Sequence, residues 1–600
     1  MNIIGLNAFG QNPSACLLID GKLVSFSHEE RFNRMKGSHG LFPSQALSWC
    51  LKQNNFALED IDYIAFNWDC DKYPFKIFTE LVKSRFSKNK TIFKKDSSFK
   101  NNSSAVNILD HLVSYNPKLI KEKIRDNLRM AGHGGEIPKI IFVNHHLAHA
   151  YQAYYQSDFK DSLVLVADGH GEENCISGYK VVNENFIKII GYNIPNSLGW
   201  FYGAFTAYLG FHANRDEGKL MGLAAYGEKR KEVNPWIERL DKLIQLKNNH
   251  LEFDPKFLKY GGNYYHPRYT NLLVKFITSY DQEMVPINVN QLVLHNGKRI
   301  NKYLLNKYID LAYAVQTKLE ESLVHIVKGM VQQTKITKLA YAGGVALNCK
   351  ANQMILAKSG VSEIFVHPAS SDDGSSIGAA FYVARETGDS VRNVLKNVQI
   401  GASFSNDSIL KTIKQANLKF KHIDNVPTAT AKYLEEGNII GWFQGGAEMG
   451  PRALGGRSII ASLNDAIVKD KINERVKFRE TWRPYCPSIL AEEQANFVEN
   501  SVDTPFMVVA ANAKKKLKNV APSIVHIDNT IRPQTVNKNS NKLWHEMISQ
   551  QNKLTGIPMI LNTSFNVRGE PIVNSPRDAI RTFFSCGLDK LVIGNYVISK

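Results

Sequence analysis

Three histidines stand within five residues, at His145, His146 and His149, directly after the apolar run 140–143. If a helix begins here, His145 and His149 lie one turn apart on the same face, which is the spacing that lets two imidazoles share a metal ion. Asp372 is the best candidate for a third ligand, because two imidazoles and a carboxylate suit a divalent transition metal with open positions for oxygen ligands. The alternative is that these histidines make ordinary hydrogen bonds at the start of a helix.

Glycine-rich segments interrupt or border apolar strands or helices at three places, residues 168–172, 217–222 and 342–345. Glycine lets the backbone adopt positive φ and approach a ligand closely, so that amide N–H groups can face phosphate oxygens. The third segment opens a predicted helix that continues through residue 352, and the N-terminus of a helix favours an anion. One such segment marks any tight turn, but three in one chain favour a nucleotide-binding cleft.

Two segments near the C-terminus, GPRALGGRS at 450–458 and KFRETWRP at 477–484, hold cations between glycine and proline turns. Arginine binds phosphate in bidentate geometry, and rigid turns fix the direction of its side chain. Glu480 is the only acid in the second segment. The alternative is a surface cluster of arginines paired with acids. The cations are Arg452, Arg457, Lys477, Arg479 and Arg483, and further polar segments follow at 526–534 and 562–569.

Strands and turns must position these segments. The sequence predicts the same order of strands and turns twice. In each copy a strand, a glycine turn, a second strand, a tight turn and a third strand follow one another. The predicted strands are residues 2–8, 15–19 and 23–27 in the first copy and 163–167, 175–182 and 186–190 in the second. We therefore expect an α/β fold with a duplicated domain pair in the N-terminal part.

Six hundred residues are too many for one compact core, so two or three domains are expected. The composition shifts near residue 395, which predicts one domain at 1–395 and another at 396–600. Residues 83–139 read as a polar, basic insertion in the first domain. Across 83–100 phenylalanines alternate with lysines, a pattern that can bind nucleic acid through phosphate contacts and base stacking. The alternative is a solvated helix that its phenylalanines anchor to the protein.

The net charge of +18, from 74 Lys+Arg against 56 Asp+Glu, favours polyanionic partners such as nucleic acid or phosphorylated ligands. An apolar fraction of 44% and a charged fraction of 22% argue against global disorder. The cysteines form no CxxC pair, which argues against a zinc cluster and a disulfide scaffold. No signal peptide or membrane-spanning run is evident, so a cytoplasmic protein without a membrane partner is expected.

Over essentially its whole length the chain resembles the NodU/CmcH family of O-carbamoyltransferases. The resemblance rests on HHLAH at 145–149, DGHGE at 168–172, EGKLMGLAAYG at 217–227, GGVALN at 343–348, the two arginine-rich segments and residues 562–571. It implies an N-terminal duplicated actin-like ATPase (Kae1-like) domain and a C-terminal YrdC-like α/β domain. The second domain would form carbamoyl-adenylate from ATP and carbamoyl phosphate. The first would transfer the carbamoyl group to an acceptor hydroxyl and release AMP.

The resemblance also implies roles for individual residues. His145, His149 and Asp372 would hold a divalent metal, expected to be Fe²⁺, while Mg²⁺ would accompany ATP. The candidates for catalysis are His28, Asp168, His170 and Lys219. The residues expected to bind the adenylate, ATP and carbamoyl phosphate are Gly343, Gly344, Asn348, Arg452, Arg457, Lys477, Arg479, Arg483, His526, Asp528, Arg532, Asn562, Ser564 and Arg568. A homodimer is the candidate assembly.

The sequence departs from the family pattern at two places. Relatives commonly carry His, often His-Asp, in the first glycine turn, where this chain has Gln11 and Asn12. Glutamine cannot act as a general base, so the base stays open among His28, His170, Asp168 and metal-assisted deprotonation. Relatives also tend to carry an arginine where Gly446 stands, which removes one expected phosphate contact.

The acceptor expected by default is the hydroxyl of a small molecule or a sugar. The alternative is a hydroxymethylated base in DNA or RNA, which the net charge and the stretch 83–100 favour and which would need to be flipped out or single-stranded. Threonylcarbamoyl transfer to tRNA is a third interpretation, against which the domain order and the segment 450–458 argue. From a different class, an inactive module that binds nucleotide and nucleic acid is supported only by Gln11.

Overall fold

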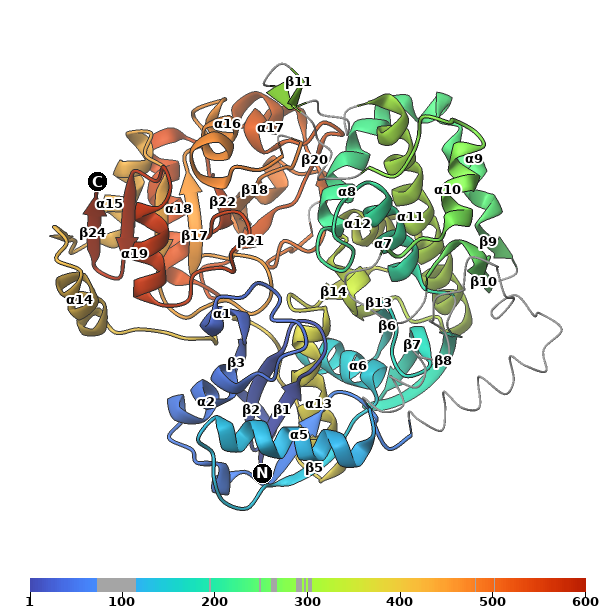
Figure 1. Cartoon of the computed structure of the whole chain (residues 1–600). Coiled ribbons are helices and arrows are strands. Elements are labelled where there is room, and N and C mark those ends of the chain that lie inside the picture. The colour runs from blue at the N-terminus through green and yellow to red at the C-terminus, as the bar shows by residue number, and fades with distance from the viewer. Residues whose placement is uncertain are drawn as a thin grey trace.

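The computed structural model describes residues 1–72, 115–193, 196–247, 250–259, 267–287, 294–295, 298–299, 305–480, 482–500 and 502–600. These residues form three large sheets, two in the N-terminal part and one in the C-terminal part (Figure 1). The predicted basic stretch 83–100 lies outside the described residues. The end of the predicted insertion is described and contains helix α5 (Pro117–Met130).

The first two sheets share one topology. The first consists of β1 (Asn2–Asn7), β2 (Ser14–Ile19), β3 (Lys22–His28), β4 (Tyr63–Phe66) and β5 (Lys139–Phe142), and the second of β6 (Ser162–Ala167), β7 (Asn174–Val182), β8 (Asn185–Asn193), β13 (Lys338–Ala342) and β14 (Glu363–Val366). Their orders are β3-β2-β1-β4-β5 and β8-β7-β6-β13-β14. In both, the first strand pairs antiparallel with the second and parallel with the fourth. This repeat confirms the predicted α/β fold with a duplicated domain pair.

Two helices connect these sheets at the centre of the N-terminal half. Helix α6 (His145–Gln156) follows β5, and α13 (Asp372–Glu386) follows β14 and packs against both α6 and β1. Gly378 of α13 lies so close to α6 that an added Cβ would clash with the carbonyl oxygen of Ala148. A larger residue there would separate the two helices and displace the side chains at their N-terminal ends.

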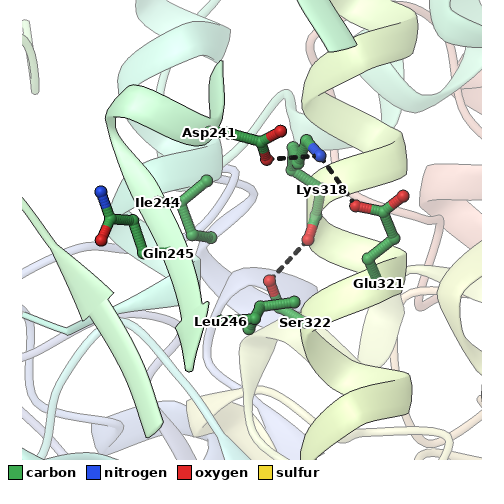
Figure 2. A pocket seen from close by; sticks show the side chains of 7 residues that line it. All are labelled: Asp241, Ile244, Gln245, Leu246, Lys318, Glu321 and Ser322. Atoms are coloured by element: carbon green, nitrogen blue, oxygen red, sulfur yellow. Dashed lines mark hydrogen bonds and ion pairs between the residues drawn. The ribbon is translucent and has the colours of Figure 1, made fainter. Parts of the chain in front are cut away.

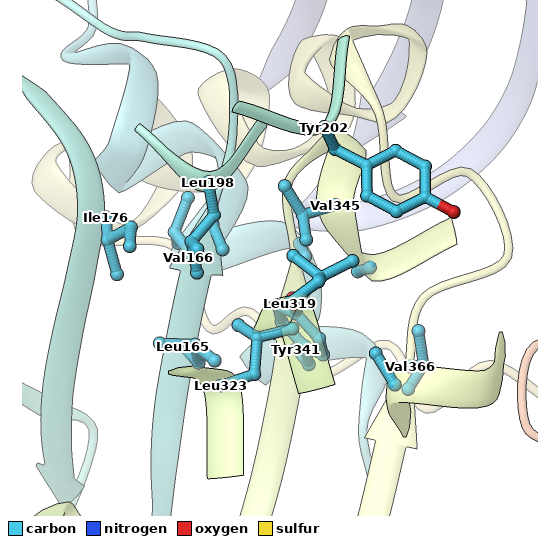
Figure 3. Packing of buried hydrophobic residues seen from close by; sticks show 14 of the residues in the cluster. Leu165, Val166, Ile176, Leu198, Tyr202, Leu319, Leu323, Tyr341, Val345 and Val366 are labelled. Atoms are coloured by element: carbon cyan, nitrogen blue, oxygen red, sulfur yellow. The ribbon is translucent and has the colours of Figure 1, made fainter. Parts of the chain in front are cut away.

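Helix α11 (Asn306–Thr334) covers the second sheet. Its residues Leu319 and Leu323 pack into the same core cluster as Leu165 and Tyr341 of the strands (Figure 3). Although α11 has 29 residues, the described part of the chain contains no helix apolar and long enough to cross a membrane. The other N-terminal helices are α1 (Glu30–Asn33), α2 (Ser44–Gln53), α7 (Leu198–Tyr208), α8 (Glu217–Ala224), α9 (Trp236–Arg239), α10 (Asn271–Thr278) and α12 (Cys349–Lys358), and the short strands are β9 (Ile244–Lys247), β10 (His250–Phe253), β11 (Leu294–His295) and β12 (Lys298–Arg299).

The C-terminal part contains an eight-stranded mixed sheet in the order β15-β24-β23-β16-β17-β22-β18-β21. Consecutive residues Ile459 and Ile460 belong to different core clusters, because side chains alternate between the faces of a sheet and helices cover both. The strands are β15 (Lys421–His422), β16 (Ile440–Phe443), β17 (Arg457–Ala461), β18 (Cys486–Leu490), β21 (Gln534–Val536), β22 (Met559–Ser564), β23 (Lys590–Ile593) and β24 (Tyr596–Ser599), with β19 (Ala511–Asn512) and β20 (Thr530–Ile531) as a separate pair. The helices are α14 (Asn406–Gln415), α15 (Val426–Glu435), α16 (Val468–Ile472), α17 (Lys515–Val520), α18 (Lys542–Thr555) and α19 (Pro576–Phe584).

This sheet confirms the predicted second α/β unit. The boundary predicted near residue 395 falls between α13 and α14 and stays a prediction.

Candidate active site

Four ligand-type side chains converge where α6, α13 and β6 meet. The Nε2 atoms of His145 and His149 lie 3.2 and 3.4 Å from Oδ2 of Asp168. The same two nitrogens lie 3.7 and 3.8 Å from Oδ1 of Asp372. One donor atom from each of the four residues lies within 4.8 Å of the others. Asp168, which we expected among the catalytic candidates, thus stands with the three predicted ligands, and we call these four residues the His-Asp group.

The histidine rings present Nε2 to the carboxylates. Nδ1 of His145 lies 3.2 Å from the backbone carbonyl oxygen of Asn67, so Nδ1 carries the proton and Nε2 keeps its lone pair. His149 is fully buried. Two imidazole nitrogens and two carboxylate oxygens that converge in the interior fit a divalent transition metal.

The imidazoles and the carboxylates of the His-Asp group stabilise one another's charged forms. Burial alone would lower the pKa of His149, but Asp168 and Asp372 outweigh burial and raise that pKa to about 9. Burial acts to raise the pKa of Asp168, but the two imidazoles hold it well below its usual range. The Asp168 carboxylate therefore stays ionised at neutral pH and available to a cation.

Glu172 ties the start of α6 to the neighbouring loops. Its Oε1 accepts hydrogen bonds from the backbone N–H of Asp69 at 2.7 Å and of His145 at 2.9 Å, and its Oε2 accepts one from the Asn144 amide at 2.7 Å. The side chain of Asn144 also caps α6. A carboxylate at this end of a helix is favoured by the helix dipole. Glu172 therefore fixes the backbone of His145.

Replacing Glu172 with alanine leaves three donors without their acceptor, and we expect the free energy of unfolding to fall by about 2–4 kcal/mol. Metal binding should weaken by about 10–100-fold, because supporting interactions orient metal ligands. Thermal unfolding and a metal titration measure the two effects. Glu172→Gln keeps an acceptor and should recover most of the stability. Unchanged metal affinity in Glu172→Ala would show that Glu172 serves the fold alone.

His28 lies beside the His-Asp group. Its Nε2 is 2.8 Å from Oδ2 of Asp373, the residue after the ligand Asp372, and both partners are buried. The strand register pairs His28 with Ser14, at the end of the glycine turn that contains Gln11. The structure thus holds a His-Asp pair close to the turn where the family resemblance predicts a histidine.

His170 lies on the other side of the group, among aromatic side chains. Its ring centre is 5.9 Å from that of Trp68 and 5.1 Å from that of Trp200. Trp68 in turn lies 5.0 Å from the ring of His145. His28 and His170 therefore both stay candidates for the general base.

The segment at 343–348 approaches the His-Asp group through its backbone. Gly343 has φ +93° and packs against the end of β6, where any Cβ would clash, and the N–H of Gly344 lies 3.2 Å from Oδ1 of Asp168. The predicted continuous helix is wrong here. Residues Gly344–Leu347 form a 3₁₀ turn, and α12 begins only after Asn348, whose side chain caps it. The glycines remain the reason why this backbone can lie so close to Asp168.

Asn348, the last residue of the segment 343–348, belongs to a buried polar network whose other members lie outside the sequence motifs. The amide oxygen of Gln316 accepts hydrogen bonds from the Tyr202 hydroxyl at 2.7 Å and from Asn348 at 3.0 Å, and its amide donates to Glu320 at 2.8 Å. Burial raises the pKa of Glu320. The only sequence signal was a pair of polar residues on α11, a helix that is otherwise largely apolar where it is buried.

Among the predicted C-terminal arginines, Arg452 and Arg483 lie close enough to other cations, Arg479 among them, for their pKa values to be affected. Burial lowers the pKa of Arg452 to about 9, and the nearby cations Arg532 and Arg483 add to this effect. Burial and Arg479 lower the pKa of Arg483 to about 10. Cations that lie close enough to lower a neighbour's pKa are stabilised by a bound anion.

Lys477 is held in the same place by the loop after β22. Its Nζ donates to the carbonyl oxygens of Ser564 and Asn566 at 2.5 and 2.8 Å. Burial, together with Arg479 and Arg483, holds its pKa well below the usual range. Arg568 lies at the outer side of the loop, half exposed.

Arg457 does not join these cations, contrary to the prediction. Its guanidinium donates to the backbone carbonyls of Gln444 at 2.8 Å, Gly445 at 3.1 Å and Ala402 at 2.8 Å, and it stacks over Phe443 at 3.6 Å. The side chain is fully buried. Arg457 therefore stabilises the loop, and most of its N–H donors are not available to a ligand.

The loop 450–457 is positioned by Glu448. The carboxylate oxygen Oε1 accepts three backbone N–H bonds from residues 454–457 at 2.6–3.0 Å. Gly446, where relatives carry an arginine, packs so tightly against the carbonyl oxygen of Gln399 that an added Cβ would clash. The close packing of the backbone at this point therefore requires glycine.

The remaining predicted residues connect loops and domains. Asn562 donates to the carbonyl of Ala453 at 3.0 Å and so supports the arginine-bearing loop. Asp528 pairs with Lys350 of α12 at 2.9 Å and with His526 at 3.5 Å. Lys219, a catalytic candidate, does not lie in the His-Asp group. It lies at the interface with the C-terminal domain, beside Glu480.

A pocket of about 370 Å³ between β9 and α11 contains none of these residues (Figure 2). Lys318, on its wall, pairs with Asp241 at 2.7 Å and with Glu321 at 3.0 Å. Because two carboxylates face its one lysine, the described residues that line this pocket offer no unpaired positive charge to a phosphate.

Two family models match the chain. The model described as carbamoyltransferase N-terminus matches residues 2–381, and that described as carbamoyltransferase C-terminus matches residues 431–600. Nodulation protein NolNO of Sinorhizobium fredii is 32% identical over 99% of this chain and 80% of its own length. The 3'-hydroxymethylcephem-O-carbamoyltransferase of Amycolatopsis lactamdurans is 30% identical over 43% of this chain and 48% of its own length. The chain belongs to the carbamoyltransferase family.

Proposed function

We propose that this protein is an O-carbamoyltransferase that forms carbamoyl-adenylate from ATP and carbamoyl phosphate and passes the carbamoyl group to an acceptor hydroxyl. The observation that carries the proposal is that one chain holds two sites, one suited to a cation and the other to an anion. The N-terminal half holds four convergent metal-type ligands, and the C-terminal domain holds a partly buried cluster of arginines. Family membership supports it.

The arginine cluster suits the activating step. Carbamate is a poor electrophile and needs a better leaving group. Water cleaves carbamoyl phosphate to carbamate and phosphate, and a carbamate oxygen then attacks the α-phosphorus of ATP and expels pyrophosphate. Arg452, Arg479 and Arg483 would hold the phosphate oxygens, on which charge builds up as pyrophosphate leaves. Mg²⁺ would accompany ATP.

The His-Asp group suits the transfer step. His145, His149, Asp168 and Asp372 would hold a divalent metal, for which we propose Fe²⁺, and such a metal supplies a Lewis acid. The glycine turn 343–344, which presents no side chain to a ligand, and the start of α12 would bind the adenylate phosphate. His28 and His170 are the imidazoles proposed to accept the proton of the acceptor hydroxyl. Attack of that hydroxyl on the carbamoyl carbon then releases AMP.

The proposed acceptor is a small hydroxylated molecule or sugar, because a relative is named for carbamoyl transfer to a hydroxymethylcephem. The alternative acceptor is a hydroxymethylated base in nucleic acid. Its support is the net charge of +18 and the stretch 83–100, which lies outside the described residues.

Incubation with ATP, labelled carbamoyl phosphate, Mg²⁺ and Fe²⁺ tests the proposal. Pooled hydroxylated metabolites and hydroxymethylated DNA serve as separate acceptors. We expect AMP release, with one labelled carbamoyl group appearing in a product of one of the two pools. An absence of AMP with every acceptor and metal would contradict the proposal.

A further inference from the structure

The loop that carries Arg452 is held by a side chain from the N-terminal half of the chain. Arg31 of α1 is only 3% exposed, and its Nη2 donates a hydrogen bond to the backbone carbonyl oxygen of Gly450 at 3.0 Å. Gly450 stands two residues before Arg452. Helix α1 lies on the side of the N-terminal half that faces the C-terminal domain (Figure 1). One buried arginine therefore joins the two halves at the start of the arginine-bearing loop.

The position of Arg31 is fixed by its neighbours in the N-terminal half. The carboxylate of Glu29, which precedes α1, accepts hydrogen bonds from the backbone N–H of Gln45 at 3.0 Å and of Ala46 at 2.9 Å. Arg31 also pairs with the carboxylate of Glu30. Because the guanidinium is planar and both its backbone and its charge are held, Arg31 presents a donor of fixed direction to the loop.

Gly450 also contacts the N-terminal half through its backbone. Its φ is +89°, and an added Cβ would lie 2.4 Å from the carbonyl oxygen of Pro368. Pro368 belongs to the connection from β14 to α13, four residues before Asp372 of the His-Asp group. A hydrogen bond and a close backbone contact, both from the N-terminal half, therefore fix Gly450.

The two ends of the loop are held by different parts of the chain. Glu448 and Asn562 hold the later part, residues 453–457, from inside the C-terminal domain. The first part begins at Gly450, and Pro451 follows it. Proline has little freedom in φ, so a displacement of Gly450 is passed on to Arg452. The position of Arg452 therefore depends on the bond that Arg31 makes.

Arg452 has a donor that suits a ligand. Its Nε is buried and has no hydrogen-bond partner within the described residues. A buried N–H group without an acceptor is costly, and phosphate oxygens are strong acceptors for a guanidinium. Arg457 in the same loop instead donates to backbone carbonyls. Of these two arginines, Arg452 is the one whose position matters for a bound phosphate.

We infer that Arg31 is a positioning residue for adenylate formation, because it holds Gly450 and thereby directs Arg452 toward the phosphates of the substrate. The inference rests on the proposed function, which assigns adenylate formation to the arginine cluster. It makes the contact between the two halves a condition for activation. Carbamoyl-adenylate would then form only while the transfer site lies beside the site that supplies it.

Exchange of labelled pyrophosphate into ATP, measured on the full-length protein with carbamoyl phosphate, tests the inference. We expect Arg31→Met to slow exchange at saturating ATP by about 10–100-fold, because a small displacement of a group that contacts the transition state is costly. Arg31→Lys keeps a cationic donor and should recover most of the rate. Exchange by Arg31→Met at the wild-type rate would overturn the inference and leave the proposed function standing.

A double-mutant cycle with Arg452→Met separates positioning from docking of the two halves. In the Arg452→Met protein, Arg31→Met should slow exchange by less than about threefold, since the group that it positions is already missing. Arg34→Met is the matched comparison, because Arg34 also crosses between the halves and donates to the carbonyls of Pro571 at 2.9 Å and Ile572 at 2.7 Å. Its effect should be the same with and without Arg452. An equal loss from Arg31→Met in both backgrounds would show that Arg31 only joins the halves.

Thermal unfolding of each variant separates a lost rate from lost folding. If Arg31→Met does not fold, Arg31→Gln takes its place in the cycle, because glutamine stays polar but is too short to reach Gly450. Exchange by the wild type, together with equal losses in the two backgrounds, would contradict the inference alone. No exchange by the wild type would contradict the proposed function, and the role of Arg31 would fail with it.

Discussion

His149→Ala is expected to abolish metal binding and to reduce carbamoyl transfer from preformed carbamoyl-adenylate by roughly 1,000-fold or more, which is several kcal/mol of transition-state stabilisation. The reason is that His149 is fully buried and supplies one of only four convergent donors. Formation of the adenylate should continue within about twofold of the wild-type rate, because that step is proposed for the other domain. Metal analysis and transfer assays with added Fe²⁺ measure the two effects.

His146→Asn is the matched control for this experiment. His146 is the neighbour of His145 on α6 and equally buried, but its Nδ1 pairs with the Ser177 hydroxyl at 2.8 Å. It does not belong to the His-Asp group, so the control should keep its metal. Full metal content in His149→Ala, or equal metal loss in both variants, would contradict the assignment of the group.

The second large effect is expected from Arg483→Met, which should slow adenylate formation by roughly 100–1,000-fold. Arg483 belongs to the arginine cluster, whose neighbouring cations lower its pKa, and it lies 3.8 Å from Glu480. Transfer from preformed carbamoyl-adenylate should change little. Pyrophosphate release measured in a single turnover separates the two steps.

Arg475→Met controls for the loss of one arginine from the same region. Arg475 pairs with Asp589 at 2.7 Å on the protein surface and is about half exposed. A surface ion pair contributes little, so this variant should form the adenylate at the wild-type rate. An Arg483→Met enzyme as active as Arg475→Met would show that the arginine cluster does not bind the reacting phosphates.

The spacing of residues along the sequence was enough to predict the two histidines of the His-Asp group. The two histidines are one helical turn apart, and α6 begins at His145, so the helix alone places them together. Asp168 directly follows β6 and Asp372 begins α13, and only the packing of the two sheets brings them to the histidines. Asp168 was therefore recognised as a chemical group, but its place among the ligands depends on tertiary structure.

Dependence on tertiary structure also explains why the prediction failed for Arg457. Arg452 and Arg457 stand five residues apart in one glycine-rich loop and look equivalent in sequence. The loop folds around Glu448, which turns Arg457 into the core, where backbone carbonyls of three other residues surround it. Whether an arginine faces a ligand or the protein depends on these carbonyl positions, which no residue pattern specifies. The repeated strands were predictable because alternation and turns are local.

The most direct test of the proposed function is the exchange of labelled pyrophosphate into ATP by the wild-type protein. If the protein forms carbamoyl-adenylate reversibly, label should enter ATP in the presence of carbamoyl phosphate, and the reaction should stop when carbamoyl phosphate is left out. Arg483→Met should lower the exchange strongly, while His149→Ala should leave it nearly unchanged. No exchange with carbamoyl phosphate, or equal exchange without it, would contradict the proposed function.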